Sequence, residues 1–296
     1  MGIRLIATDL DGTLLSSATT VSERTRRAVT AAQRAGIVVV PATGRPIVAA
    51  PELIPASMTR LMVCTNGAIA YDHGERRVLL ERTIAPAVQA DFVDAFSRAL
   101  PGLAWAAVTD SGHSFRAGPG YLTLMRQGDH GRNRSIESEL DLAGVVSEPA
   151  VKLVARHPVL DEEELLVVAR ELAHPGVNCT TSGVPFLEIA AAGVSKESTL
   201  SLIADALGIL PAETMAFGDS GNDLGMLRWA GRGVAMGNAI QAAQEAADLI
   251  TATNNEDGVA LVIERLLAEQ FGAAEPVSSP PRDEQPADGE SLAVGA

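Results

Sequence analysis

The chain has 296 residues, of which 47% are hydrophobic and 20% are charged, a balance typical of a globular protein with enough length for two domains. The formal net charge of -14 argues against nucleic acid or an anionic membrane surface as a partner. Two widely spaced cysteines, no apolar run of membrane-spanning length and a first strand that begins at once predict a cytoplasmic protein.

An apolar run that ends in two carboxylates opens the chain. Residues 3–7 are short enough for a buried strand, and Asp9 and Asp11 follow where the run ends. Gly12 after Asp11 signals a turn. Ligands of open α/β sheets bind at the carboxyl ends of the strands, so the two acids are candidates for a site. A strand followed by a polar turn would also account for them.

Two more strands are predicted in the first third of the chain. Ser22 is a candidate N-cap for a helix that Gly36 ends. The apolar runs 37–40 and 61–64 are each followed by small polar residues. Strands that alternate with helical patterns predict βαβ units and therefore a parallel sheet. We expect the polar residues that follow these strands to meet at one edge of that sheet.

The pattern changes between residues 84 and 183. An amphipathic helix is predicted over 86–100 and a second helix over 162–173, with several short strands around them. The stretch 118–134, rich in glycine and arginine, matches no element. We interpret 84–183 as an inserted α+β domain.

The α/β pattern returns after residue 184. Strands are predicted at 186–189, 214–217, 233–236 and 249–251, and helices at 196–207, 224–230, 240–246 and 258–270. Residues 1–83 and 184–271 are therefore predicted to form one discontinuous core domain. The last residues, 272–296, are rich in proline, serine and acids and are predicted to be a disordered tail.

Two segments of the predicted core could hold an anion. Thr43 and Gly44 follow the second strand, where a glycine lets backbone amides approach a ligand closely. Lys196 opens a predicted helix, a position that opposes the helix dipole unless an anion lies nearby. An N-cap at Thr43 and a solvated lysine are the alternative interpretations.

A second pair of acids, Asp219 and Asp223, follows the strand 214–217. Together with Asp9 and Asp11 they would bring four carboxylates into one cleft, where each pair repels by about 4 kcal/mol at 4 Å and an effective dielectric near 20. Such a site needs a cation, and ligands that are all oxygen atoms favour Mg²⁺ over zinc.

Asn254 and Asp257 precede the last predicted helix. They are interpreted either as a capped helix start or as a support beside the metal.

Several motifs occur in a fixed order along the chain. Four of them are Asp9-Leu10-Asp11-Gly12-Thr13, Thr43-Gly44-Arg45, Gly193-Val194-Ser195-Lys196 and Gly218-Asp219-Ser220-Gly221-Asn222-Asp223. In this order the chain resembles the haloacid dehalogenase-like (HAD) phosphatases. Thr65-Asn66-Gly67-Ala68 and Glu256-Asp257-Gly258-Val259-Ala260 make it similar to the Cof-type branch, which carries a type IIB cap. The resemblance covers residues 1–270 and implies a Rossmann-like parallel-sheet core with the cap inserted.

The resemblance also implies roles for these residues. Asp9 would be the nucleophile that forms an aspartyl-phosphate, and Asp11 would protonate the leaving oxygen and then activate water. Mg²⁺ would be held by Asp9, by Asp219 and by Asp11 or a nearby backbone oxygen. The phosphoryl group and substrate would be held by Thr43, Arg45, Lys196, Asn222 and the amides of Leu10 and Gly44. The supporting residues would be Asp223, which would orient Lys196 or metal-bound water, Asn254 and Asp257.

Two positions depart from the usual pattern of this branch. Ser220 stands where glycine is common, and a small residue should fit there. Glu197 stands where glycine is frequent, and a carboxylate there could narrow the site or repel the substrate. The departure at Glu197 therefore bears on substrate preference more than on chemistry.

The predicted function is Mg²⁺-dependent hydrolysis of small phosphate monoesters, such as sugar phosphates. A phosphotransferase or phosphomutase acting on sugar phosphates would use the same aspartyl-phosphate. A non-catalytic phospho-accepting regulatory module is a third alternative, although its acceptor would follow a later strand of one short domain. The expected partner is a small phosphorylated metabolite, and monomer and homodimer both stay open. The cap would choose the substrate.

Overall fold

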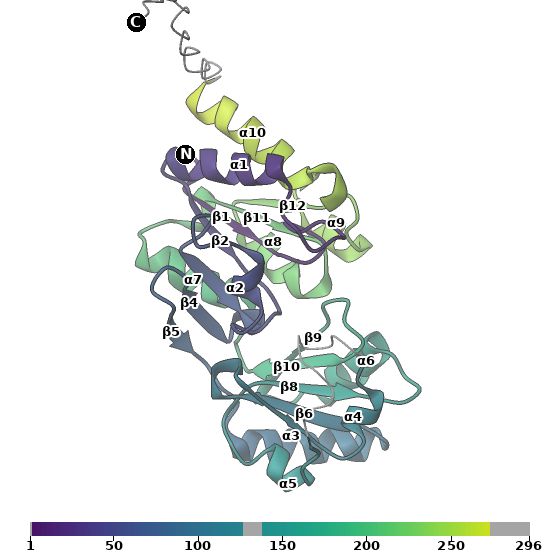
Figure 1. Cartoon of the computed structure of the whole chain (residues 1–296). Coiled ribbons are helices and arrows are strands. Elements are labelled where there is room, and N and C mark those ends of the chain that lie inside the picture. Colours follow the sequence, from purple (N-terminus) through teal and green to yellow (C-terminus); the bar gives the residue numbers. More distant parts are fainter. Residues whose placement is uncertain (1, 127–137, 273–296) are drawn as a thin grey trace, which may run out of the picture.

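Two units that follow one another along the long axis of the molecule make up the protein (Figure 1). The computed structural model describes residues 2–126 and 138–272. One unit contains both ends of the described chain, and the other is built from its middle. Of the predicted tail, 272–296, only Gly272 lies within the described residues, and part of the unassigned stretch 118–134 lies outside them as well.

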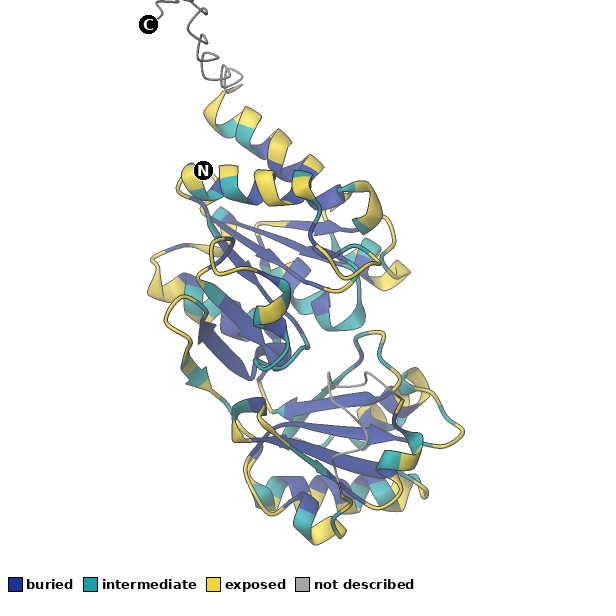
Figure 2. Ribbon diagram, viewed as in Figure 1, coloured by how far each residue is buried: buried dark blue, intermediate teal, exposed yellow. Residues whose placement is uncertain are grey.

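A five-stranded parallel sheet organises the first unit, as the alternation of strands and helices predicts. Its strand order is β13-β12-β11-β1-β2. The strands are β1 (Leu5–Thr8), β2 (Val38–Pro41), β11 (Thr214–Gly218), β12 (Arg232–Ala235) and β13 (Leu249–Ile250). All four residues of β1 are buried, because helices cover both faces of the sheet (Figure 2).

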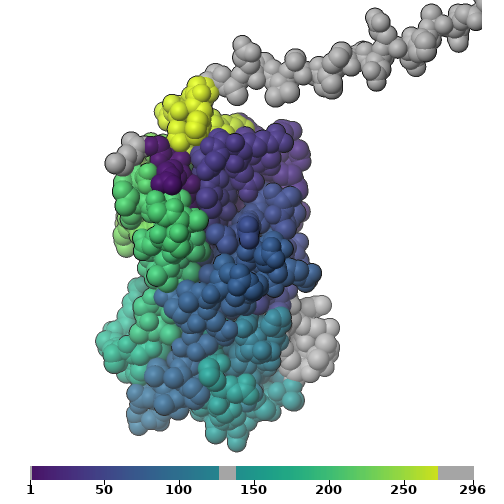
Figure 3. Space-filling model, turned by 90° about the vertical axis from the view of Figure 1, so that its left-hand side faces the viewer, coloured from purple at the N-terminus to yellow at the C-terminus, as the bar shows by residue number. Residues whose placement is uncertain are grey.

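The side chains of β1 alternate between two apolar layers. Ile6 packs with residues of α1 and α10, whereas Leu5 and Ala7 pack with residues of α7 and α8 on the opposite face. The helices of this unit are α1 (Glu23–Arg34), α2 (Ala50–Leu53), α7 (Lys196–Ala206), α8 (Leu224–Trp229), α9 (Gln241–Ala246) and α10 (Gly258–Phe271). The start of the described chain lies beside α10 (Figure 3), where the side chain of Gln270 bonds the backbone of Ile3.

A second, antiparallel sheet continues from the edge strand β2. Its strands are β3 (Leu61–Cys64), β4 (Ile69–Asp72) and β5 (Arg77–Glu81). A single parallel bridge between Ala42 and Val63 joins β3 to the chain after β2. The turn from β3 to β4 is a short 3-10 helix, η1 (Thr65–Gly67), in which Asn66 has a φ of 53°. The sequence pattern predicts β3 but not β4, because this reversal takes only four residues.

The middle of the chain forms a five-stranded antiparallel sheet in the order β7-β6-β8-β10-β9. Its strands are β6 (Ala104–Thr109), β7 (Ser114–Ala117), β8 (Ala150–Arg156), β9 (Val177–Thr180) and β10 (Leu187–Ala191), and its helices are α3 (Pro86–Ala99), α4 (Tyr121–Leu124), α5 (Leu142–Val145) and α6 (Glu162–Leu172). Phe92 of α3 and Leu165 of α6 pack with Leu153 of β8 and Ile189 of β10. None of the helices in the described ranges is long and apolar enough to cross a membrane.

The prediction that the strand 186–189 returns to the core is wrong. This segment is β10, an interior strand of the antiparallel sheet, where Leu187 pairs with Ala155 and Ile189 with Cys179. A short apolar run carries no information about which sheet it joins, and here the pairing with the preceding strand β9 is local in sequence. We therefore propose that the inserted unit extends to Ala191 instead of ending at residue 183.

Candidate active site

The polar residues that follow β1, β2 and β11 meet at one edge of the parallel sheet. The amide of Asp9 donates to the carbonyl of Phe217 at 3.0 Å, which ties the end of β1 to the end of β11. Gly12 has a φ of +78°, and a Cβ atom there would lie 2.3 Å from Oδ2 of Asp219. A glycine is therefore required for the turn after β1 to approach the turn after β11 this closely.

Lys196 joins two of the carboxylates at this edge. Its Nζ donates to Oδ1 of Asp9 at 2.6 Å and to Oδ1 of Asp223 at 2.7 Å. Lys196 is the first residue of α7, and the side chain of Ser195 caps that helix. Burial alone would lower the pKa of Lys196, but the facing carboxylates of Asp223 and Asp9 raise it above its ordinary value.

Asp223 is fully buried and has a partner on both carboxylate oxygens. Its Oδ2 accepts hydrogen bonds from the amides of Asp219 at 3.0 Å and of Ser220 at 3.1 Å, while Oδ1 faces Lys196. The turn after β11 thus wraps around this carboxylate and fixes it. As a result, Asp223 can hold the side chain of Lys196 in one orientation.

Among the described residues, three carboxylates are close enough to bind one metal ion. Oxygen atoms of Asp9, Asp219 and Asp223 all lie within 4.8 Å of one another. Burial, and then the charge of Asp223, raise the pKa of Asp219 to about 6. The pKa of Asp9 is also raised, chiefly by burial, although Lys196 opposes this. One ammonium facing three carboxylates leaves negative charge in excess, and the all-oxygen donor set fits Mg²⁺.

The side chain of Asp11 lies outside this group. Arg45 donates to both of its oxygens, from Nε at 2.7 Å and from a terminal nitrogen at 2.6 Å, and both side chains are partly exposed. The hydrogen bond to Asp11 raises the pKa of Arg45. The Asp11 carboxylate, one of the two metal-ligand alternatives predicted at this position, therefore does not belong to the group of three carboxylates. Arg45, predicted to bind substrate, holds Asp11 in this structure.

Thr43, Gly44 and Asn222 lie at the same edge of the sheet. The hydroxyl oxygen of buried Thr43 accepts a hydrogen bond from the amide of Arg45 at 3.1 Å. The Nδ2 atom of Asn222 donates to Oδ1 of Asn66 at 2.9 Å. The side chain of Leu10 is buried in the apolar core.

The two residues before α10 contact other parts of the chain. Asn254 donates from Nδ2 to the carbonyl of Leu15 at 2.8 Å. Asp257 accepts from the hydroxyl of Ser22, the N-cap of α1, at 2.5 Å. Both side chains therefore hold the segment that follows β1, and Asp257 is not part of the group of three carboxylates.

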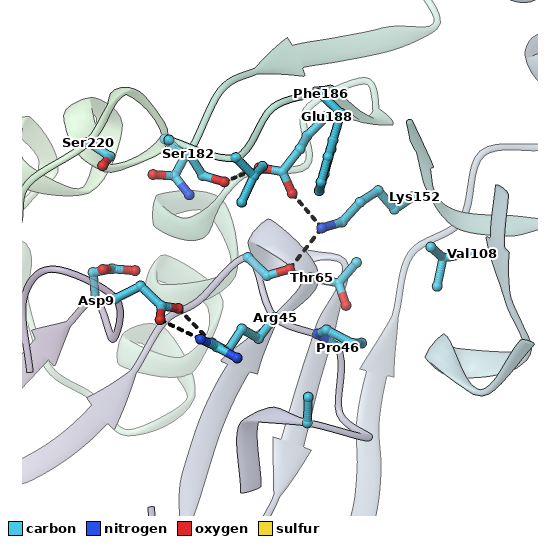
Figure 4. A pocket seen from close by; sticks show the side chains of 16 residues that line it. Asp9, Arg45, Pro46, Thr65, Val108, Lys152, Ser182, Phe186, Glu188 and Ser220 are labelled. Atoms are coloured by element: carbon cyan, nitrogen blue, oxygen red, sulfur yellow. Dashed lines mark hydrogen bonds and ion pairs between the residues drawn. The ribbon is translucent and has the colours of Figure 1, made fainter. Parts of the chain in front are cut away.

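A cavity of about 310 Å³ lies between the two units, and Asp9 is one of the residues that line it (Figure 4). The parallel-sheet unit supplies Asp9, Asp11, Gly44, Arg45, Pro46, Ala49, Thr65, Ser220 and Asn222, and the antiparallel-sheet unit supplies Val108, Lys152, Ser182, Gly183, Val184, Phe186 and Glu188. Glu197, at which a carboxylate could narrow the site or repel the substrate, does not line the cavity. Its carboxylate instead packs against Gly225.

Sequence reasoning missed Lys152 and Glu188, the two charged residues in the wall opposite Asp9. Lys152 donates to Oε1 of Glu188 at 2.5 Å, and both side chains are buried. The carboxylate is desolvated, yet Lys152 holds the pKa of Glu188 below its ordinary value. One signal was present in the sequence, because a single lysine interrupts the otherwise apolar run 150–155. A charge inside such a strand requires a buried partner.

Comparisons with known proteins agree with this geometry. The family model of haloacid dehalogenase-like hydrolases matches residues 6–263. The chain is 31% identical over 262 residues to the 5-amino-6-(5-phospho-D-ribitylamino)uracil phosphatase YcsE of Bacillus subtilis, with 88% of this chain and 94% of that protein covered. It is 30% identical over 276 residues to the pyridoxal phosphate phosphatase YbhA of Escherichia coli, with 89% and 98% covered. Among solved structures, the HAD subclass IIB sugar phosphatase BT4131 is similar with a TM-score of 0.73 at 27% identity, over 88% of this chain and 98% of that one.

The matched range contains every residue described above at the sheet edge and in the cavity wall. The protein is an enzyme, a phosphatase of the haloacid dehalogenase-like kind. By its family model, its fold and its neighbours, the chain belongs to the haloacid dehalogenase-like hydrolases, in the Cof-type branch that carries a type IIB cap.

Proposed function

We propose that the protein hydrolyses small phosphate monoesters, sugar phosphates or related metabolites, with Mg²⁺ and through an aspartyl-phosphate on Asp9. One observation carries the proposal. The Asp9 carboxylate lies at the cavity floor, bound by Lys196 at 2.6 Å and grouped with Asp219 and Asp223. A buried carboxylate held in this way is positioned for attack, because the surrounding contacts restrict its rotation.

The reaction divides into two displacements at phosphorus. In the first, an oxygen of Asp9 attacks phosphorus, the bond to the leaving oxygen breaks, and Asp11 gives that oxygen a proton. In the second, the Asp11 carboxylate takes a proton from a water molecule, which attacks phosphorus and releases Asp9 and inorganic phosphate. Asp11 thereby returns to its protonated form, and the cycle is balanced.

The acidic group would hold the metal ion. Asp9 and Asp219 would supply carboxylate ligands, together with Asp223 or a backbone oxygen of the turn after β1. When bound, Mg²⁺ would offset the excess negative charge of the group and stabilise charge on the transferring phosphoryl group. Lys196 contributes a fixed positive charge beside Asp9 whether or not the metal ion is bound.

The phosphoryl group would be held by the residues predicted for it from the sequence. The hydroxyl oxygen of Thr43 already accepts the amide of Arg45, so its own proton is directed elsewhere and can be donated to a phosphoryl oxygen. The amides of Leu10 and Gly44 and the side chain of Asn222 would bind the remaining oxygens. Arg45 donates to both oxygens of Asp11 and would hold this carboxyl in place beside the leaving group.

The cavity wall supports a leaving group of mixed polarity. Val108, Val184 and Phe186 provide apolar surface, and Lys152, Ser182 and Glu188 provide polar surface. We include phosphorylated heterocycles in the substrate class beside sugar phosphates, because relatives are named for phosphoribitylaminouracil and pyridoxal phosphate.

Replacement of Asp9 tests this function. Asp9→Asn keeps the size of the side chain but removes the attacking charge, so phosphate release with Mg²⁺ should fall at least about a thousandfold across a panel of phosphate esters. Asp248→Asn is the matched control, since Asp248 accepts a backbone amide outside the site. Near wild-type turnover of folded Asp9→Asn protein would overturn the mechanism.

A further inference from the structure

Only two of the 296 residues are lysines, against 21 arginines, and both lysines are buried near the cavity. Lys196 lies behind Asp9, and Lys152 lies in the opposite wall. We propose that Lys152, paired with Glu188, is a positioning residue that fixes the phosphate-binding loop 43–45 when the cap covers the core. This inference rests on the proposed function, because it requires that loop to hold phosphate.

A direct hydrogen bond links Lys152 to the loop. Its Nζ, on β8 of the cap, donates to the carbonyl of Gly44 at 2.8 Å and to Oε1 of Glu188 on β10 (Figure 4). The hydroxyl of Ser182 donates to the other oxygen of Glu188 at 2.5 Å. Lys152 is 7% exposed and Glu188 is 2% exposed, so bulk water cannot substitute for these contacts. The cap therefore holds one atom of the loop through a buried charge that is paired with Glu188.

The contact with Gly44 sets the direction of the next amide. The carbonyl of Gly44 and the amide of Arg45 belong to one planar peptide unit. Lys152 binds this unit on its oxygen side, and the Thr43 hydroxyl binds it on its nitrogen side. Loss of the Lys152 contact would free the unit to rotate. That rotation would also release the Thr43 hydroxyl from the orientation in which it can donate to phosphate.

Gly44 is packed tightly beneath the cap. A Cβ atom at Gly44 would lie 3.0 Å from Oδ1 of Asn66 and 3.5 Å from Oε1 of Glu188. That same oxygen of Asn66 accepts the hydrogen bond from Asn222. The Lys152–Glu188 pair thus adjoins the loop 43–45 and, through Asn66, Asn222, which are two of the segments to which phosphate binding is assigned. It can act on them whatever the leaving group.

Stability alone does not explain this pair. Taking two charges out of water costs about as much as their attraction returns, and apolar residues of similar volume often serve equally well. The choice of lysine is also specific, in a chain that has 21 arginines and only one other lysine. An ammonium is a compact donor that can serve a carbonyl and a carboxylate in a small space, whereas a guanidinium is a wide planar fork.

The decisive experiment uses the full chain and inorganic phosphate, which has no leaving group. In the double variant Lys152→Met/Glu188→Met both charges are removed, so neither is left buried without a partner. With Mg²⁺ present, calorimetric titration should show phosphate affinity reduced on the order of tenfold, as expected for a lost charge-assisted hydrogen bond. The kcat/KM values for all phosphate esters, including p-nitrophenyl phosphate, should fall by a common factor.

The matched control is Arg116→Met/Glu148→Met. These residues form another ion pair within the cap, at 2.7 Å, and Arg116 bonds only cap residues in the described chain. This control should keep phosphate affinity and kcat/KM within about twofold of wild type, as expected for a partly exposed pair. A comparable loss in the control would overturn the inference, because the effect would then come from general loosening of the cap.

Other outcomes separate this inference from the proposed function. Unchanged phosphate affinity in the Lys152/Glu188 double variant would overturn the inference, and so would a loss confined to a few esters, since that pattern belongs to a leaving-group contact. If wild-type protein neither binds phosphate nor releases it from any ester, the proposed function fails instead.

A measurement on wild-type protein covers the case in which the double variant does not fold. Selective ¹³Cε labelling of lysine gives only two side-chain NMR signals, which Lys152→Arg assigns. Added inorganic phosphate with Mg²⁺ should shift the Lys152 signal as well as the Lys196 signal. A Lys152 signal that stays in place at saturating phosphate would overturn the inference.

Discussion

The two lysines form ion pairs of opposite character on the two sides of one cavity. Lys196 faces Asp9 and Asp223, with Asp219 close by. These four residues, which we call the core group, carry more negative than positive charge. Lys152 faces Glu188 alone, and these two residues, which we call the cap pair, have no net charge. Lys152 uses a second donor for the carbonyl of Gly44. The core group is therefore arranged to take up a cation and a reacting group, whereas the cap pair can act only through position.

Removal of the metal ion should have the largest effect on phosphate release. If it had no effect, the difference drawn between the core group and the cap pair would be wrong. Chelation with EDTA should abolish phosphate release, and Mg²⁺ should restore it, because the core group needs a cation to offset its charge. Phosphate release assayed before and after metal is added back provides the measurement. Full turnover in a rigorously metal-free preparation would contradict the excess negative charge assigned to the core group.

The effect of Mg²⁺ on thermal stability should depend on pH. The pKa of Asp219 in the folded protein is raised from 3.8 to about 6. Its contribution to stability is therefore fully present below about pH 4 and is lost as pH rises through about 6. Without divalent cations this carboxylate should lower Tm as pH rises through that range. Added Mg²⁺ should then raise Tm more at about pH 8 than at about pH 5, and an equal rise at both would contradict this reasoning.

Replacement of Lys196 should come next in size. Lys196→Met leaves Asp9 and Asp223 buried without their shared cation, and breaking such a buried pair costs about 3 to 5 kcal/mol of stability. Turnover should fall by about a thousandfold or more, because the nucleophile loses its positioning contact. Thermal melting and phosphate release measured on one preparation separate the two effects. If turnover survives in folded protein, Lys196 is a structural lysine.

The difference between the two lysines also explains what could be predicted from the sequence. The site around Lys196 could be found because each of its segments follows an apolar strand or opens a helix, and those are local signals. The partner of Lys152 lies 36 residues away, on a strand that the sequence pattern assigned to the core. Antiparallel pairing leaves no local mark of its partner, so the cap pair and the sheet that contains the strand 186–189 were both missed.

The bidentate contact between Arg45 and Asp11 was also missed. Each residue was recognised as part of a motif, but their side chains meet across 34 residues of sequence. Motif spacing places residues at the sheet edge and does not show which of several charged neighbours will pair. The parallel sheet itself was predictable, because its order of strands and helices follows directly from the alternating pattern.

A smaller effect is expected when Arg45 is replaced. In Arg45→Met the Asp11 carboxyl loses both of its hydrogen bonds and is no longer held in place. The kcat/KM value for alkyl phosphates should fall on the order of tenfold, because their leaving oxygen needs a proton from a positioned acid. The value for p-nitrophenyl phosphate should change much less, since its leaving group is stable without that proton.

A matched variant makes the Arg45 measurement decisive. Arg24→Met removes another arginine with two hydrogen bonds to a carboxylate, that of Glu264, on the surface away from the cavity. It should leave both esters unaffected. If Arg45→Met slows both esters equally, Arg45 binds the phosphoryl group, as its motif first indicated, and does not position Asp11.

The smallest change in kcat/KM is expected when Glu197, the residue next to Lys196, is replaced. This replacement tests whether the core group includes a further carboxylate. A carboxylate at this position was expected to disturb the substrate, yet it packs against Gly225 and does not line the main cavity. Glu197→Gly should therefore change kcat/KM by less than about threefold for any ester, while glycine near the start of α7 costs up to about 1 kcal/mol of stability. Glu197→Gln, which keeps the packing and removes the charge, separates these two effects. A severalfold gain in kcat/KM with Glu197→Gln would mean that this charge acts on the substrate, and the core group would then include a fourth carboxylate.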